Sequence, residues 1–213
     1  RYHVPRAAPL ESPNSRLCRD TTNDLAIISA VFRAYLNAST IIEDEDHVLH
    51  SQATIRLNRL ADYVMTTVPP GIAVDGGPST GDLILSFGIL LRNGRPGDPW
   101  SERHASLPNS PLDVPCSFHA VHAQLLPVFP ADLVGLDQRG TPLFTAVRNA
   151  TLAFRPTANF GHTIIPICLA RLGEADRLPA ILRQWVDEYQ HFPQGLFSYF
   201  KRSYRTLWET NRW

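Results

Sequence analysis

The sequence is poor in cysteine and has no excess of charge of either sign. Its 213 residues include three cysteines, Cys18, Cys116 and Cys168, and no C-x-x-C pair, so neither a zinc finger nor a thioredoxin-like motif is supported. One disulfide with a free thiol, or three buried thiols, would fit this count. Lys+Arg and Asp+Glu are 20 each, without the basic stripe of a nucleic-acid binder. We therefore expect no nucleic-acid partner and a neutral or small polar ligand.

Long apolar runs and a leader segment are also missing. No window approaches the roughly 18 uninterrupted apolar residues of a membrane span, so we expect no membrane partner. The chain begins at Arg1 and shows neither the charged nor the apolar region of a signal peptide, as expected of a processed form or a fragment. Two glycosylation sequons, Asn37-Ala-Ser39 and Asn149-Ala-Thr151, favour a secreted or extracellular location.

Apolar residues at helical spacing dominate what is present. In residues 20–42 the apolar side chains recur every three or four positions, and a second such pattern covers residues 43–64. The two predict a helical hairpin. Four further helical patterns cover residues 118–129, 142–154, 161–172 and 174–189.

Residue types at the ends of these patterns are typical of helix termini. Asp20, Thr21 or Thr22 can cap the first helix, and Thr141 precedes a proline that suits a first helical position. Gly173 is placed as a C-terminal cap. Pro166 falls inside its pattern, where it predicts a kink or a later helix start.

Glycine and proline concentrate between residues 69 and 115, which we interpret as a loop insertion. Within it, "LILSFGILL" is either a strand or a short buried helix, because the run is too short to decide. The whole of residues 1–213 is treated as one mainly α domain. A bundle, a solenoid and a toroid remain equally compatible with the helical pattern.

Four segments resemble the family 95 glycoside hydrolases, in the order in which that family has them. "YHVPRAAPLESPN" leading into "DTTNDLAIISAVFRAYLNAS" is similar to the family's Y-H-L-P…S-P-E and D-T-N-x-D-L-A-L-L. "FHAVHAQLLPVFPADLV" resembles its R-H-x-S-H-L-x-x-x-Y-P. "TPLFTAVRNATLAFR" and "LARLGEADRLPAILRQWV" are similar to two later helices.

The resemblance implies the C-terminal portion of a six-hairpin (α/α) toroid. It also implies hydrolysis of glycosidic bonds with inversion, α-L-fucosides being the best-known substrates. The expected partner is an oligosaccharide or polysaccharide substrate, and the expected chemistry requires neither a cofactor nor a metal. Inversion needs a carboxylic acid and a second carboxylate that activates water, roughly 6.5–9.5 Å apart.

Two carboxylates are the candidate catalytic groups. Glu11 is the counterpart of the glutamate in the family's S-P-E, although the order here is E-S-P. Glu209, in "RTLWETNRW", corresponds to the family's V-I-E-T-P segment. The alternative is that each is a solvated loop acid.

The candidate sugar-binding residues are Asp20, Asn23, Asp24, His119 and His122. The first three match the family's D-T-N-x-D, with one residue fewer between the asparagine and the second aspartate. Helix capping explains the same residue types. The two histidines are three apart and therefore share a helix face. They either line a sugar site, bond to backbone carbonyls or, if further ligands exist, hold a metal.

Departures from the family pattern leave a second hypothesis open. Phe118 and Val121 replace the arginine and the serine of R-H-x-S-H. A catalytically inactive or truncated toroid fragment, which binds carbohydrate or has a structural role, is therefore the alternative to an active glycosidase.

Overall fold

The computed structural model describes residues 1–3, 18–43, 46–67, 79, 81–85, 89–90, 103–104, 123–153 and 159–190. Within them the chain is mainly α. The helices are α1 (Thr22–Ile41), α2 (His47–Arg59), α3 (Pro142–Ala153), α4 (Asn159–Arg171) and α5 (Leu178–Tyr189), with 3₁₀ turns η1 (Ala123–Leu125), η2 (Leu136–Gln138) and η3 (Ala175–Arg177). The strands are β1 (Cys18–Arg19), β2 (Met65–Thr67), β3 (Leu83–Leu85), β4 (Ile89–Leu90) and β5 (Arg103–His104).

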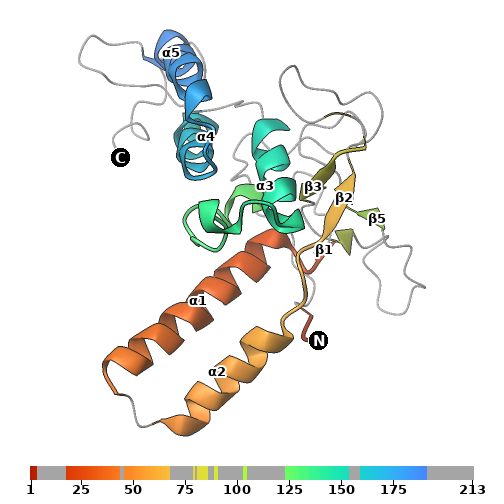
Figure 1. The fold of residues 1–213 in the computed structure, drawn as a ribbon, viewed down its shortest axis with the longest axis vertical. Coiled ribbons are helices and arrows are strands. Elements are labelled where there is room, and N and C mark those ends of the chain that lie inside the picture. Colours follow the sequence, from red (N-terminus) through yellow and green to blue (C-terminus); the bar gives the residue numbers. More distant parts are fainter. Residues whose placement is uncertain are drawn as a thin grey trace.

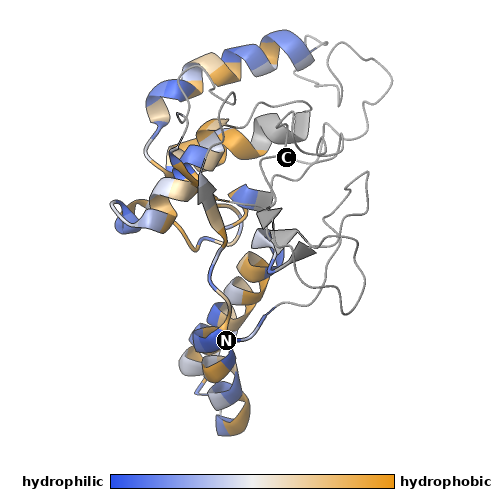
Figure 2. Cartoon of the chain, turned by 90° about the vertical axis from the view of Figure 1, so that its right-hand side faces the viewer, coloured by the Kyte–Doolittle hydropathy of each residue, from blue (hydrophilic) through white to orange (hydrophobic). Residues whose placement is uncertain are grey.

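The predicted hairpin of α1 and α2 is confirmed. The two helices lie side by side and project from the rest of the molecule (Figure 1). Thr21 caps α1 by accepting a hydrogen bond from the Asp24 N–H, and Asp46 caps α2 in the same way through Leu49. Figure 2 shows apolar and polar residues alternating along this projecting part.

The second helix is shorter than its pattern predicts. It ends at Arg59, because Leu60 turns to an extended conformation and pairs with Tyr2 in a parallel bridge. The Tyr2 N–H donates to the Arg59 carbonyl, and the Ala61 N–H donates to the Tyr2 carbonyl at 2.8 Å. The apolar pattern would have allowed α2 to continue to residue 64, but pairing with the N-terminal segment ends the helix earlier.

The core lies where α3 meets β3, η1 and α4. Its largest fully buried side chains include Ile84, Leu85, Leu125, Ile165 and Leu169. The segment "LILSFGILL", which could have been a strand or a helix, contains the two strands β3 and β4. Strand β3 pairs with β2, and β4 lies between β1 and β5.

Asn149 on α3 fixes the helix to the strand beside it. Its Nδ2 donates to the Leu83 carbonyl at 2.8 Å, and the residue is 7% exposed. Thr151 of the same sequon is also buried. This sequon is consequently closed off in the folded chain.

The α-helix predicted over residues 118–129 is wrong for the part that is described. Residues 123–125 form the 3₁₀ turn η1, and turns continue to residue 130. Pro127 and Pro130 lack the N–H that an α-helix needs, which is why the apolar pattern does not become helical here. The prediction for residues 118–122 lies outside the described residues.

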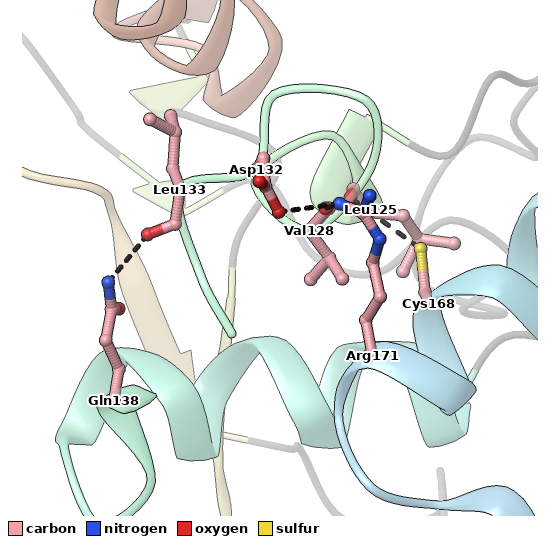
Figure 3. Close-up of polar contacts among 7 residues, drawn as sticks. All are labelled: Leu125, Val128, Asp132, Leu133, Gln138, Cys168 and Arg171. Carbon is pink, nitrogen blue, oxygen red and sulfur yellow. Dashed lines mark hydrogen bonds and ion pairs between the residues drawn. The ribbon is translucent and has the colours of Figure 1, made fainter. Parts of the chain in front are cut away.

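Contacts from α4 hold the loop that replaces this helix (Figure 3). Arg171 donates through Nη1 to the Val128 carbonyl at 2.9 Å and to Asp132 Oδ1 at 2.7 Å. Its guanidinium also lies 5.4 Å from the centroid of the Phe129 ring. The loop is thus held both by backbone hydrogen bonds among its own residues and by a helix about 40 residues away in sequence.

The last two helices follow the local signals closely. Gly173 has φ +80°, Gly173 N–H donates to the Ala170 carbonyl, and Glu174 N–H donates to the Leu169 carbonyl. This is a Schellman motif, which confirms the predicted C-cap. Helix α4 already begins at Asn159, so Pro166 lies within it and does not mark a later start.

Candidate functional site

The start of α1 carries three of the predicted site residues, Asp20, Asn23 and Asp24. Strand β1 ends at Arg19, and Asp20 then adopts the left-handed region with φ +50° before Thr21 caps the helix. Aspartate tolerates this backbone conformation better than most residues. Asp20 is 2% exposed, so the turn directs a carboxylate into the protein.

His3 is the partner of that buried carboxylate. His3 Nδ1 lies 2.8 Å from Asp20 Oδ2, and the side chains are 52% and 2% exposed respectively. If Nδ1 carries the proton that Asp20 accepts, Nε2 keeps a lone pair on the exposed side of the ring. The pair therefore resembles a base held in one orientation by an acid, a common arrangement in enzyme sites.

His3 is the residue of this cluster that the sequence reasoning did not select. It lies within the "YHVP" segment, but it stands 17 residues before Asp20. The pairing of Tyr2 with Leu60 places the N-terminal segment at the end of α2. The signal that could have found His3 was the histidine of the family's Y-H-L-P pattern.

Asp24 and Asn23 complete the cluster on the first turn of α1. The Thr21 hydroxyl donates to Asp24 Oδ2 at 2.6 Å, while Asn23 Nδ2 lies 3.4 Å from Asp24 Oδ1. The Asp24 N–H donates back to the Thr21 hydroxyl oxygen at 3.2 Å. The capping interpretation is therefore confirmed for Thr21 and Asp24. Among the described residues, no group bonds to the Asn23 carboxamide oxygen, which could therefore bond to a ligand.

The other predicted site residues lie outside the described residues. These are Glu11, His119, His122 and Glu209. The convergence of Glu11, His119 and His122 with Asn23 in one cleft stays a prediction, as does the role of Glu209.

Cys168 is a buried thiol whose environment does not favour the reactive thiolate. It is free, 0% exposed, and its Sγ lies 3.9 Å from the Leu125 carbonyl oxygen. Burial raises the pKa of the thiol to about 12, although Arg171 lowers it in part. The thiolate that thiol chemistry needs is thus suppressed near neutral pH.

Among the residues that the structure describes there is no group of three or more His, Cys, Asp and Glu placed to hold a metal ion. None of the helices described there is long and apolar enough to cross a membrane.

Comparison with known proteins returned no relative: no protein-family model, no curated protein and no solved structure matches this chain.

Proposed function

We propose that this chain is part of an inverting glycoside hydrolase built as an (α/α) toroid, and that the start of α1 belongs to its sugar site. One observation carries the proposal. The two segments that resemble the family, "YHVP" and "DTTND", meet in space, because His3 contacts Asp20 beside Asn23 and Asp24. The confirmed α1–α2 hairpin, and the packing of α4 on α5 after a short turn, are consistent with a toroid made of hairpins.

In this proposal each described residue has a role that its surroundings permit. Asp20 is a positioning residue that holds the His3 ring, and His3 Nε2 accepts a hydrogen bond from a sugar hydroxyl. Asn23 contacts a second hydroxyl through its free carboxamide oxygen. Glu11 protonates the leaving oxygen and Glu209 activates water, as inversion requires. His119 and His122 are assigned to the same sugar site by the sequence resemblance alone.

The alternative is a catalytically inactive fragment that binds carbohydrate or has a structural role. A specific observation favours it: Asp24 already accepts hydrogen bonds from Thr21 and Asn23, so helix capping accounts for part of the cluster without a ligand.

Hydrolysis of chromogenic glycosides separates the two functions. The panel contains the α-L-fucoside and the α- and β-galactosides, and the chains are the wild type, Glu11→Gln and Asp20→Asn. Turnover that is lost in Glu11→Gln and reduced in Asp20→Asn, with an inverted anomer by NMR, supports the enzyme. A folded wild type without turnover that still binds a sugar of the panel supports the inactive alternative. Neither turnover nor binding would overturn both.

A further inference from the structure

A second concave feature lies between the hairpin and α3, beside the segment that follows α2. It is a groove of about 840 Å³, lined by the middle of α1, the end of α2, residues 60–65 and the start of α3. Its volume falls in the range of about 300–1,000 Å³ that small-molecule sites occupy. The groove shares no lining residue with the His3–Asp20 cluster.

Three polar side chains of the groove have no protein partner in the part of the chain that the structure describes. Arg33 and Asn37 come from α1, and Asn58 comes from α2. No hydrogen bond or ion pair joins any of them to another described residue. A guanidinium and two carboxamides in one hollow offer donors for an anion and both donors and acceptors for hydroxyl groups.

Tyr63 and Ser29 lie side by side in the wall of the same groove. The Tyr63 hydroxyl oxygen is inaccessible to solvent and makes no hydrogen bond of normal geometry with a described residue, although the Ser29 side chain is close enough to favour its ionised form. Burial raises the pKa of Tyr63 to about 12, and the nearby Arg33 and Ser29 lower it only in part. Tyr63 is therefore a neutral O–H group near neutral pH. Because this hydroxyl is out of reach of the groove, Tyr63 contributes wall surface to the site and no hydrogen bond to a ligand.

The groove carries a net positive charge when the ion pair between Asp62 and Arg1 is counted as neutral. Asp62 also lines it, but its carboxylate is paired with Arg1. Arg33 is left as the uncompensated charge. The groove also contains Thr141, which precedes α3, and the positive end of that helix dipole adds attraction for an anion.

Apolar side chains form the remainder of the wall. They include Leu36, Leu57, Met65 and Leu143. Such a surface suits the C–H face of a ring whose edge carries hydroxyl groups. The ligand that matches all of these features has one anionic group, several hydroxyl groups and an apolar face.

We propose that this groove binds a small polyhydroxylated carboxylate, of the sugar-acid class. The ligand carboxylate accepts hydrogen bonds from Arg33. Asn37 and Asn58 bond to its hydroxyl groups, and the apolar wall covers its ring face. The site does not depend on hydrolysis at the start of α1, so either proposal can fail while the other stands.

Isothermal titration of the full chain with glucuronate tests the assignment, with glucose as the neutral probe of the same ring size. We expect glucuronate to bind at least tenfold more tightly than glucose. Arg33→Met keeps the length of the side chain without its charge, and it should weaken glucuronate binding about tenfold to a hundredfold. Arg33→Lys should recover part of that loss. Arg183→Met removes an exposed arginine on α5 and is the matched control, which should bind like the wild type.

Tyr63→Phe is a second control. It removes a hydroxyl that lies out of reach of the groove and keeps the ring in the wall, so glucuronate binding should stay as in the wild type. Equal affinity for glucuronate and glucose, no binding of either at millimolar concentration, or unchanged binding in Arg33→Met would overturn the proposal.

Discussion

Single residues with unusual backbone conformations reveal where side-chain contacts dominate local preference. Asp20, Glu43 and Asp132 are the non-glycine residues with positive φ in the described part of the chain. Glu43 and Asp132 are exposed, whereas Asp20 is buried and faces His3. The backbone at Asp20 is therefore held in place by what its carboxylate bonds to, as is common at functional sites.

Replacement of Asp20 tests this interpretation. Asp20→Ala removes the acceptor of His3 and places a less tolerant residue in the left-handed region, so the free energy of unfolding should fall by about 1–3 kcal/mol. Asp20→Asn keeps a hydrogen-bonding side chain that tolerates this conformation, and it should lose less. Urea unfolding at neutral pH measures both. Equal stability of Asp20→Ala and the wild type would show that the pair with His3 contributes nothing.

The environment of Cys168 makes a separate prediction about reactivity. Because burial raises the pKa of its thiol to about 12, the neutral form dominates at neutral and mildly alkaline pH, and little thiolate is present to react. Alkylation by iodoacetamide, followed by peptide mass spectrometry, should modify Cys168 only after denaturation. Rapid modification in the folded chain would contradict the packing of α4 against Leu125.

At the scale of elements, local signals predicted more than long-range ones. The capping residues Thr21 and Thr141 and the turn at Gly173 act within four residues of themselves, so their types alone indicate the helix ends. The loop after η1 could not be predicted in this way. Its conformation depends on Arg171, which follows the loop by 39 residues or more.

Gly173, in the Schellman turn between α4 and α5, and Gly140, before α3, form a matched pair for glycine substitutions. Gly173 and Gly140 both have positive φ. A Cβ at position 173 would lie 2.6 Å from Arg139 Nη2 and 3.0 Å from Leu136 Cδ2, whereas position 140 has nothing within 4 Å. We expect Gly140→Ala to lower the free energy of unfolding by about 1 kcal/mol and Gly173→Ala by about 2 kcal/mol. Thermal or urea unfolding measures both losses. A larger loss for Gly140→Ala than for Gly173→Ala would contradict the contacts described for position 173.

The whole molecule divides into a packed centre and a projecting hairpin. Helix α3 buries Phe144, Val147 and other residues in the core, while Ala53 is the buried residue that α2 contributes in the described structure. Val31 and Val48 on the hairpin are 58% and 68% exposed. Periodicity in the sequence predicted the helices. It did not predict that α3 is more deeply buried than the hairpin, because an apolar stripe does not specify whether another element covers it.

Hydrogen exchange should therefore follow this division. Amides of α2 and of the second half of α1 are expected to exchange through local opening, well before amides of α3 and of the C-terminal half of α4. Exchange measured by mass spectrometry on peptides of the native chain checks the order. Uniform protection across both parts would indicate that the hairpin is covered in solution.

The site was predictable from the sequence only in part. Asp20, Asn23 and Asp24 are neighbours in sequence, so their proximity follows from the first turn of a helix. The approach of His3, and the groove that collects Arg33, Asn58 and Tyr63, result from how the chain returns on itself at residues 60–65. No spacing in the sequence encodes that return.

The buried position of Asn149 has a consequence for biosynthesis. If this chain is translocated during synthesis, its second acceptor sequence is exposed only until α3 docks onto β3 and the carboxamide bonds to Leu83. Transfer of a glycan to Asn149 would then compete in time with docking, since the attached sugar has no room between helix and strand. A glycan at this position would mark molecules that had not completed their core, and the folded population would carry none.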